Sequence, residues 1–504
     1  MANNFLATAN RVAAHLGKPP KDFTKEDIIR VVQDFDIRMV NLMYPGGDGR
    51  LKTLNFMLNS ADYLNTILTC GERVDGSSLF SSIEAASSDL YVMPVFRTAF
   101  IDPFQEIPTL CLLCDYFDRD GQPLASAPEH TLRKAMQAFH KVTGMEFQAM
   151  GELEYYVIKA NDPSFPATDQ KGYHETAPFA KANDFRTRCM KLNRPQGSGP
   201  KSIKYGHSEV GNFTKDGLCY EQNEIEFLPV PADECAYELL VAKWIIRNLG
   251  HQEGYNITFS PKIIVGKAGS GMHIHMRIMK DGRNMMLTPE RTLSVEARKA
   301  IAGMMDLAQS ITAFGNKNPM SWLRLVPHQE APTNICWGMS NRSVLVRVPL
   351  GWTSGRDMCM EANPNEPHVE RDYTSKQTVE MRSPDGSADI FQLLAGLCVA
   401  CRHGFEMPNA EEVAEQTFAD GDIHAPENAA KLAAMKALPD SCAASADCLE
   451  QQRAVYEEYG VFSPKMIDGI LKELRAFNDR TMRDDIAGDD SKLQALVERH
   501  FHCG

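Results

Sequence analysis

Acidic and imidazole side chains occur in pairs, two residues apart, within segments whose composition is typical of β-strands. The pairs are Glu152 and Glu154, Glu224 and Glu226, His273 and His275, and Glu380 and Arg382. Because side chains alternate between the two faces of a strand, both members of a pair point the same way. Together the pairs predict one sheet with a strongly polar face. Like charges held side by side are unfavourable unless a cation neutralises them, and a divalent metal with carboxylate and imidazole ligands would do so.

The side chains predicted to bind metal are carboxylates and one imidazole. They are Glu152, Glu154, Glu209, Glu224, Glu380 and His273. Such a set could hold two or three Mg²⁺ or Mn²⁺ ions, and Mg²⁺ in proteins commonly binds through carboxylates together with substrate phosphates. A solvated strand face would explain one acidic pair alone, whereas the whole set favours a metal site.

Three arginines form a second group of candidate residues. Arg324 lies in SWLRLVP, and Arg342 and Arg347 lie in SNRSVLVRVP. The guanidinium group suits bidentate contact with phosphate or carboxylate, although a surface ion-pair network is the alternative for these arginines alone. Arginines opposite a metal cluster favour phosphoryl transfer, a reaction that depends on positioning and electrostatic stabilisation.

Two glycine-containing turns are weaker signals. In KAGSGMHIH, Gly269 and Gly271 would let the backbone approach a ligand closely, but the GxxxxGK[ST] pattern of a P-loop is absent there. In VDGSS, Asp75 and Ser78 by themselves indicate only a turn.

Local patterns outline the elements that must position these groups. Capping residues, acids in a first turn, and Pro or Gly at helix ends mark the helices, and runs of apolar residues mark the strands. The expected elements are a helix over 24–35, strands within 37–97, a buried strand over 109–116, a helix over 128–144, a strand-rich region over 147–385 and helices after 390. A domain boundary is expected between Gly121 and Pro128, which gives domains of residues 1–124 and 125–504.

Bulk composition argues against two classes of protein. The 504 residues include 53 Lys and Arg against 66 Asp and Glu, a net charge of -13, which disfavours a nucleic-acid partner. No apolar run reaches membrane-spanning length, and the first residues lack the pattern of a signal peptide, so we expect a cytoplasmic protein. The CxxC pairs at 111–114 and 398–401 lie among apolar residues, where cysteine behaves as a small hydrophobic side chain.

Considered in order, the motifs of this chain resemble those of the glutamine synthetase family, most closely its bacterial type I form. The matching stretches are GERVDGSSL, MGELEYYVI, HSEV, EQNEIEF, AGSGMHIH, LRLVPHQEAP, NRSVLVRVP and VEMRSPDGSAD, and they span about residues 71–390. The resemblance implies an α+β fold, with a small N-terminal β-grasp-like domain and a large catalytic domain built on a curved antiparallel sheet with flanking helices. It also implies a homo-oligomer, a double-ring dodecamer, in which the DGSS loop completes the active site of the adjacent subunit.

The same resemblance implies a reaction and a set of roles. The reaction joins glutamate and ammonium to form glutamine with ATP as co-substrate, through γ-glutamyl phosphate. Glu154, Glu209 and Glu224 would bind one metal, and Glu152, His273 and Glu380 the second; Arg324, Arg382 and Gly269 would bind glutamate, and Arg342, Arg347 and His275 would bind ATP; Asp75, Ser78, Tyr173, Glu209 and Glu330 would form the ammonium pocket. Within that set Arg342 would stabilise the transferred phosphoryl group, Asp75 would help to deprotonate ammonium, and Glu330 would close the site against water.

The chain departs from the family pattern in several places. Ala268 stands where an asparagine that contacts glutamate is common, and Thr378 replaces a common arginine near the nucleotide phosphates, so that a basic residue such as Lys376 would have to compensate. Extra sequence, GNFTKDGLCY, follows HSEV and leaves Asp216 and Glu221 as alternatives to Glu209. Two long polar loops, 191–205 and 356–376, are expected to cover the site or to bind ligands.

Three other functions compete with a glutamine-forming ligase. A γ-glutamyl ligase that uses a polyamine or methylamine would alter the ammonium pocket, whereas Asp75, Ser78, Tyr173 and Glu330 are all present here. A non-catalytic homologue would have lost metal ligands, and an unrelated metal-dependent hydrolase would leave the arginines unexplained.

Overall fold

The computed structural model describes residues 10–80, 83, 88–193, 203–326, 332–354, 356–369 and 374–504. Glu330 lies outside the described residues, as do most of the loop 191–205 and part of the loop 356–376, so the roles expected of them stay predictions. In the part of the chain that is described, every helix is too short or too polar to cross a bilayer.

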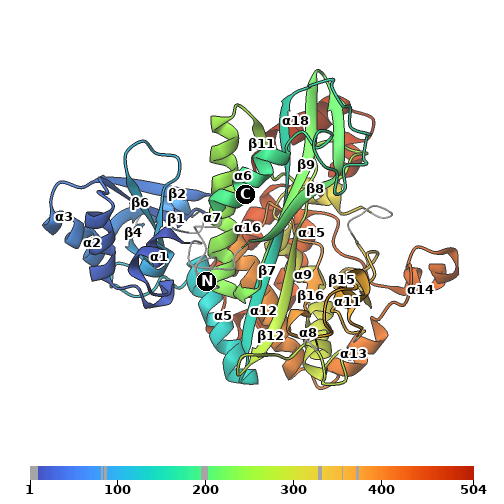
Figure 1. The fold of residues 1–504 in the computed structure, drawn as a ribbon. Helices are drawn as coiled ribbons and strands as arrows, with labels where there is room; N and C mark the ends of the chain where they lie inside the picture. Colours follow the sequence, from blue (N-terminus) through green and yellow to red (C-terminus); the bar gives the residue numbers. More distant parts are fainter. Residues whose placement is uncertain are drawn as a thin grey trace.

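The N-terminal domain is a mixed sheet with helices packed against it (Figure 1). The strand order is β2-β1-β6-β4-β3, with β1 and β6 parallel, and Leu42, Val92 and Leu112 are buried in its core. This is the arrangement expected of a β-grasp-like domain. Its elements are α1 Arg11–Leu16, α2 Lys25–Asp34, β1 Met39–Pro45, β2 Leu51–Met57, α3 Ala61–Cys70, β3 Glu72–Asp75, α4 Gly76–Leu79, β4 Asp89–Pro94, β5 Phe100–Ile101 and β6 Thr109–Phe117.

Local sequence explains most of these elements. Thr24 caps α2 in a reciprocal capping box with Asp27, and the helix 24–35 and the buried strand 109–116 are both confirmed. The expectation of strands throughout 37–97 is wrong at α3. There Ser60 accepts a hydrogen bond from the Tyr63 N–H, and the apolar side chains that follow are buried at helical spacing.

The second domain contains a long curved antiparallel sheet with β7 at its centre (Figure 1). The strand order is β14-β15-β16-β12-β7-β9-β8, and only β14 and β15 pair in parallel among the described strands of this path. The strands are β7 Glu146–Ala160, β8 Ile203–Lys215, β9 Leu218–Phe227, β10 Val230–Pro231, β11 Asn256–Thr258, β12 Met272–Lys280, β13 Arg283–Asn284, β14 Trp337–Met339, β15 Val346–Val348 and β16 Val379–Met381.

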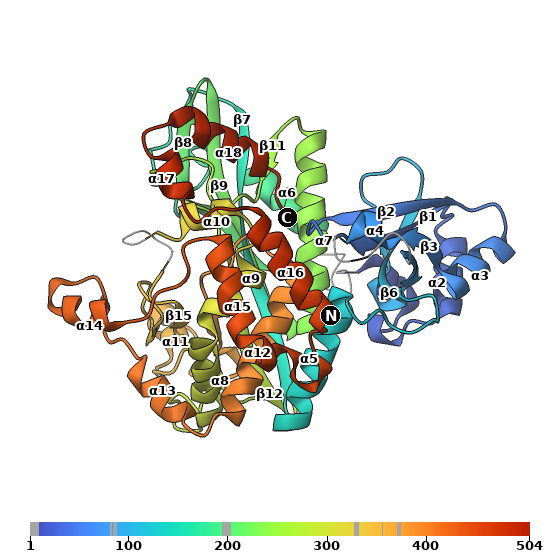
Figure 2. The same cartoon turned by 180° about the vertical axis from the view of Figure 1, so that it is seen from behind.

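Helices cover the apolar face of this sheet, as the view from behind shows (Figure 2). Leu153, Ile274 and Met381 are fully buried against them, and strand alternation therefore directs their neighbours Glu152, His273 and Glu380 to the opposite face. The helices are α5 Pro128–Thr143, α6 Asn183–Asn193, α7 Ala232–Gln252, α8 Val295–Asp306, α9 Ala308–Gly315, α10 Pro319–Arg324, α11 Met358–Ala362, α12 Ile390–Glu406, α13 Ala410–Gln416, α14 Ala429–Ala434, α15 Cys442–Glu457, α16 Pro464–Ala476, α17 Met482–Ile486 and α18 Asp490–His500.

The expectation that 147–385 consists mainly of strands is only partly right, because α6 to α11 lie within it. α7 is buried on several sides, so its apolar residues do not form the single stripe that marks an amphipathic helix. The helices predicted after residue 390 and over 128–144 are confirmed, the latter with Pro128 at its start and Gly144 in the left-handed conformation at its end. The cysteines of both CxxC pairs are buried and free, as predicted.

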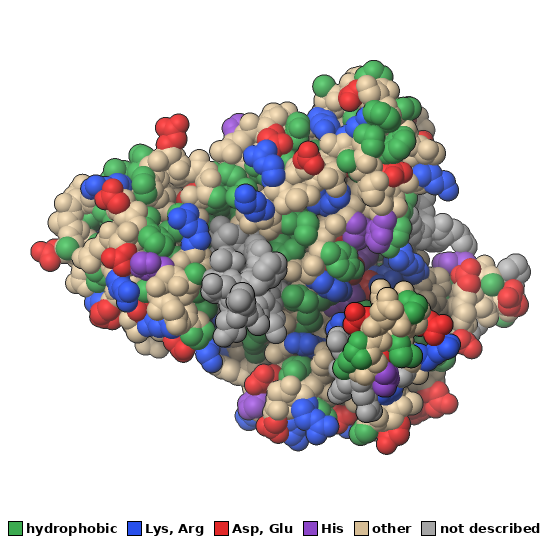
Figure 3. Space-filling view, in the orientation of Figure 1, with side chains coloured by type: hydrophobic (Ala, Val, Ile, Leu, Met, Phe, Trp, Pro, Cys, Tyr) green, Lys and Arg blue, Asp and Glu red, His purple; other side chains and the backbone are tan. Residues whose placement is uncertain are grey.

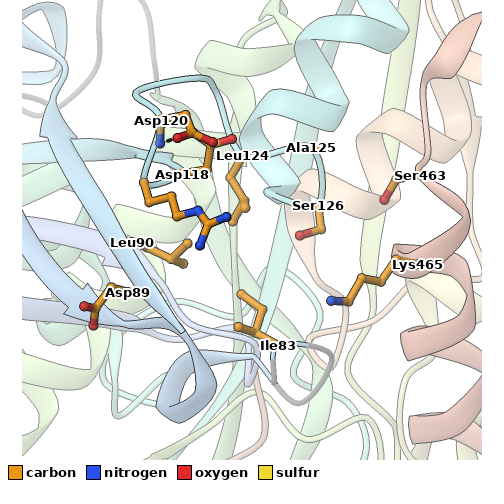
Figure 4. A pocket seen from close by; sticks show the side chains of 11 residues that line it. Ile83, Asp89, Leu90, Asp118, Asp120, Leu124, Ala125, Ser126, Ser463 and Lys465 are labelled. Atoms are coloured by element: carbon orange, nitrogen blue, oxygen red, sulfur yellow. Dashed lines mark hydrogen bonds between the residues drawn. The ribbon is translucent and has the colours of Figure 1, made fainter. Parts of the chain in front are cut away.

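The two domains meet where β6 contacts α5 and α7. The carboxylate of Glu129 on α5 accepts a hydrogen bond of 2.8 Å from the Tyr116 N–H on β6, and Tyr237 Oη donates one of 2.9 Å to Asp115. A cavity of about 360 Å³ opens at this junction, with Leu90 and Lys465 among its lining residues (Figure 4). None of the residues that line this cavity belongs to the polar face of the catalytic sheet, so it is separate from the predicted site.

Replacing Glu129 by glutamine is expected to stabilise the protein more at alkaline than at acid pH. Burial, with the nearby Asp115 carboxylate, raises the pKa of Glu129 to about 8 from 4.5. Its contribution to stability is therefore fully present below pH 4.5 and is lost as the pH rises through 8. The free energy of unfolding, measured by thermal unfolding, should be higher for Glu129→Gln relative to wild type at about pH 8.5 than at about pH 5, by about 1–3 kcal/mol. A pH-independent difference, like that expected for the exposed control Glu146→Gln, would contradict this assignment.

Candidate active site

Antiparallel pairing brings the predicted metal ligands onto one face of the catalytic sheet. Glu152 on the central strand β7 lies opposite His273 of β12 on one side and Glu226 of β9 on the other. Two residues further along β7, Glu154 lies opposite Glu224 of β9. His275 of β12 lies opposite Glu380 of β16. The pairs that the sequence places two residues apart are thus assembled into one polar surface. Figure 3 shows histidine and basic side chains together in a hollow between the upper part of the molecule, with β8 and β9, and the lower part, with β15.

The first cluster on this face is built around Glu152. His273 Nδ1 lies 2.9 Å from one carboxylate oxygen of Glu152, and His275 Nε2 lies 2.8 Å from the other. Glu380 is the third member, with an oxygen 3.5 Å from His273 Nδ1 and the other 3.8 Å from His275 Nε2. Glu152, His275 and Glu380 have ligand atoms close enough to share one metal ion, so both imidazoles, and not His273 alone, are candidate ligands.

Glu380 provides a test of whether a divalent ion suits this cluster. Its carboxylate is 1% exposed, and neither oxygen has a hydrogen-bond partner of normal geometry among the described residues. Arg347 Nε at 2.6 Å and Arg382 Nε at 3.3 Å supply positive charge without that geometry. A buried carboxylate rarely remains without a bonded partner, and a cation ligated by hard oxygen atoms would complete it. The donor set therefore fits a divalent metal.

A second cluster contains Glu224, Glu209 and His207. His207 Nε2 lies 3.2 Å from Glu224, and His207 Nδ1 lies 3.5 Å from Glu209, so that all three could ligate one ion. Glu154 is fixed between the clusters by hydrogen bonds from Gln222 Nε2, at 3.0 Å, and from the Gly271 N–H, at 2.8 Å. His207 was not among the predicted ligands, although its position two residues before Glu209 is the same signal that marked the other pairs.

The geometry of the β8–β9 hairpin decides between Glu209 and the alternatives Asp216 and Glu221. Asp216 lies at the tip of the hairpin, between the paired residues 215 and 218. The carboxylate of Glu221 accepts hydrogen bonds from the N–H groups of Lys181, at 2.6 Å, and Ala182, at 3.0 Å. The extra sequence thus extends the hairpin beyond the site, and the structure brings only Glu209 of the three to the second cluster.

Buried like charges dominate the electrostatics of this face. Burial and the neighbouring carboxylates Glu152, Glu154, Glu209 and Glu226 hold the pKa of Glu224 well above its usual value. Burial acts in the same direction on Glu152, but the imidazoles of His275 and His273 outweigh it and hold the pKa of Glu152 well below its usual value. Glu226 also joins Glu152 and Glu224 in a third potential ligand group; the sequence pairs it with Glu224, but it was not among the predicted ligands. Each of these acids gains from a cation placed among them.

The arginines line this face with part of their bonding capacity used. Arg324 is buried; it donates to the carbonyl oxygens of Ser383, at 2.8 Å, and Arg382, at 3.2 Å, and its Nη2 lies 3.4 Å from His273 Nε2. Arg382 donates to the Arg342 carbonyl and lies beside Glu380. Arg342 points to the opposite rim, where Nη2 lies 3.3 Å from Tyr173 Oη.

The structure does not bring every predicted residue to this face. Asp75 and Ser78 belong to β3 and α4 of the N-terminal domain, which both views place apart from β7 and β12 of the same chain (Figures 1 and 2). Hydrogen bonds from the Ser78 and Ser77 hydroxyls hold the pKa of Asp75 far below its usual value. A role for Asp75 in this chemistry therefore requires a second subunit.

The departures at Thr378 and Ala268 have local explanations. Thr378 Oγ1 and His275 Nδ1 are hydrogen-bonded at 2.9 Å, and Arg277 is two residues after His275 on the same face of β12. Arg277 donates to the Gln148 side chain and the Ser375 carbonyl, while the ammonium group of Lys376 lies 4.7 Å from the centre of the Trp352 ring. Ala268 keeps its place through backbone bonds, donating to Gln170 and accepting from Tyr156 Oη.

Two family models match the chain: the β-grasp domain of glutamine synthetase over residues 36–119 and the glutamine synthetase catalytic domain over residues 125–486. Glutamine synthetase of Pyrococcus furiosus is 28% identical over 475 residues, which cover 93% of this chain and 97% of the relative. That of Thermotoga maritima is 27% identical over 385 residues, 75% of this chain and 79% of the relative.

Solved structures share the fold at lower identity. A structure titled as GmaS without ligand has a TM-score of 0.71 at 18% identity and covers 93% of this chain and 98% of its own. The cryoEM structure of Plasmodium falciparum glutamine synthetase has a TM-score of 0.72 at 19% identity and covers 95% and 99%. With both domains matched and the polar face assembled, this chain is a ligase that belongs to the glutamine synthetase family.

Proposed function

We propose that the protein is an ATP-dependent glutamate–ammonia ligase that forms glutamine through γ-glutamyl phosphate. The observation that carries the proposal is the double cluster of carboxylates and imidazoles, with arginines on both sides of it. Glu152, His273 and Glu380, joined by His275, would hold one Mg²⁺ or Mn²⁺ ion, and Glu154, Glu209 and Glu224, joined by His207, another. Bound there, the ions would neutralise the phosphate and carboxylate charges that otherwise repel each other.

In this proposal the arginines position the two anionic substrates. Arg324 and Arg382, with the Gly269 backbone, bind the carboxylates of glutamate, and Arg347 and Arg342 face the phosphates of ATP. A side-chain carboxylate oxygen of glutamate attacks the γ-phosphorus, the bond to ADP breaks, and γ-glutamyl phosphate forms. Arg342, whose guanidinium lies at the rim beside Tyr173, stabilises the charge on the transferred group in this proposal.

The second half of the reaction depends on a cation site. Asp75 and Ser78 of an adjacent subunit, with Tyr173, Glu209 and Glu330, form the ammonium pocket in this proposal. The lowered pKa of Asp75 keeps its carboxylate ionised, which favours binding of ammonium more than uptake of its proton. The bound ammonium gives up one proton to a carboxylate of the pocket, the amine nitrogen so formed attacks the acyl carbon, and inorganic phosphate leaves. In this proposal a double-ring dodecamer brings the loop of the neighbouring subunit to the site. The cytoplasmic location stays a prediction.

One observation favours a second candidate, a ligase that uses an organic amine. Tyr173 and His174 stack with ring centroids 4.1 Å apart, and His207 lies 4.3 Å from His174, beside Glu209 and Glu224. Aromatic rings next to carboxylates suit an organic cation.

A comparison of amines separates the two candidates. Purified protein with glutamate, ATP and Mg²⁺ is expected to release phosphate and form glutamine with ammonium, and to turn over at least about tenfold more slowly with methylamine or putrescine. Products are identified by mass spectrometry. A γ-glutamyl amide formed only with an organic amine would transfer the assignment to the second candidate, and turnover with none of the amines would refute both.

A further inference from the structure

Lys243 is a buried lysine outside the residues assigned so far. It lies in the middle of α7 with 1% of its surface exposed, and its ammonium group donates a hydrogen bond of 2.8 Å to the Gly386 carbonyl. The ammonium nitrogen also lies 5.3 Å from the centre of the Phe259 ring. Burial lowers the pKa of Lys243 to about 7, so the structure holds this amine at a cost that an apolar side chain would not incur.

The loop that Lys243 holds also supports the arginine expected to bind glutamate. In the loop 383–389 the carbonyl oxygens of Ser383 and Pro384 accept hydrogen bonds from Arg324 Nη1, at 2.8 and 3.3 Å. Asp385 of the loop is fully buried, and its carboxylate interacts electrostatically with both Arg324 and Lys243. The loop is therefore bonded to Lys243 on one side and to Arg324 on the other.

Residues 501–504 cover Lys243 from outside. Arg247 Nη2 donates a hydrogen bond of 2.9 Å to the Cys503 carbonyl, and a Cβ at Gly504 would lie 2.6 Å from Lys243 Nζ and even closer to the Gly386 carbonyl. Gly386 is equally tight on its other side, where a Cβ would lie 2.3 Å from the Phe259 carbonyl. These covering residues lie beyond 486, where the match to the family model ends, so the contact is a feature of this chain outside the matched region.

We propose that Lys243 is a positioning residue for the glutamate end of the active site, which fixes the loop 383–389 and through it the guanidinium of Arg324. The inference rests on the proposed function, in which Arg324 binds a glutamate carboxylate. The path is continuous: Lys243 bonds Gly386, the same loop bonds Arg324, and Arg324 Nη2 lies 3.4 Å from His273 Nε2. ATP, in contrast, would bind through the guanidinium groups of Arg342 and Arg347, whose described partners are Tyr173 and Glu380. Only the backbone carbonyl of Arg342 is joined to the path, through Arg382.

Steady-state kinetics of the full-length Lys243→Met variant test this inference. The KM for glutamate is expected to rise about tenfold, while kcat and the KM for ATP stay within about twofold, because a misplaced binding arginine weakens one substrate only. Lys472→Met, which removes an exposed lysine on α16, is the matched control and should leave all three constants unchanged. A folded Lys243→Met protein with an unaltered KM for glutamate, or with both KM values raised equally, would overturn the proposal.

A second variant covers the case in which Lys243→Met does not fold. Arg247→Met removes the bond to the Cys503 carbonyl and keeps Lys243 in place, and it should raise the KM for glutamate about threefold with the KM for ATP unchanged. No change in that KM would also count against the proposal. Failure of the proposed function is distinguishable, since wild-type protein would then show no glutamate-dependent turnover with ammonium.

Discussion

Replacing Glu380 by glutamine is expected to lower kcat by about 10²- to 10³-fold and to weaken binding of Mn²⁺, the spectroscopic substitute for Mg²⁺. The carboxylate is 1% exposed and lies between two imidazoles on one side and Arg347 and Arg382 on the other. Glutamine keeps the volume but removes the charge, so the cluster loses a ligand while both guanidinium groups lose their counter-charge. Activity is measured as glutamine formation, and Mn²⁺ affinity by electron paramagnetic resonance of the unbound ion.

The metal measurement separates a chemical effect from a structural one. Loss of a buried partner of two arginines also costs stability, about 3–5 kcal/mol for such pairs, so thermal unfolding is recorded alongside. Glu152→Gln, which removes the carboxylate between both imidazoles, should reproduce the loss of Mn²⁺ affinity, and the exposed Glu290→Gln should not. Normal Mn²⁺ binding by a folded Glu380→Gln protein would rule out the role assigned to this cluster.

Mixing two inactive variants is expected to restore activity. Asp75→Asn damages the loop that one subunit is proposed to donate, and Glu380→Gln damages the site that receives it. Because Asp75 lies in the N-terminal domain, apart from β7 and β12 of its own chain, a site between subunits can combine an intact loop with an intact cluster. Random co-assembly should therefore give about one quarter of the wild-type activity per site. The co-expressed and purified oligomer is assayed for glutamine formation.

Two further mixtures control for this result. Glu152→Gln with Glu380→Gln should show no recovery, since both changes damage the same cluster, and Asp75→Asn with Ser78→Ala should show none, since both damage the loop. Recovery in either control would mean that the variants keep residual activity, and recovery in the main mixture would then not demonstrate active sites built from two subunits. The absence of recovery in the main mixture, with oligomers confirmed by mass, would place Asp75 outside the reaction or within its own chain's site.

Much of the site was accessible from sequence because the signal is local. A strand places alternate side chains on opposite faces whatever its neighbours are, so Glu152 with Glu154, or His273 with His275, could be assigned to one polar face directly. Turn and capping residues likewise indicated α2 and α5. Helices such as α7 were missed because burial on several sides removes the amphipathic pattern that reveals a helix.

The remaining site residues depended on contacts that no local pattern encodes. Glu209 reaches the cluster through the irregularity of β8 between Ser208 and Asn212, which its spacing does not reveal. Glu221, three residues before Glu224 on the regular strand β9, points to the opposite face, toward the N–H groups of Lys181 and Ala182. That Arg277 is a basic neighbour of the Thr378 region follows from the pairing of β12 with β16, which the sequence does not reveal. The support of Arg324 by Lys243 joins residues that are distant in sequence and adjacent only in the folded chain.

By itself the sequence determined the family, the polar faces of the strands and the kind of chemistry they favour, because residue type and alternation are properties of a few consecutive residues. The tertiary structure decided which acids meet which imidazoles, which arginines are already bonded, and that Asp75 is separated from the cluster within its own chain. Those outcomes depend on strand register and domain placement, which are set by packing between segments far apart in the sequence.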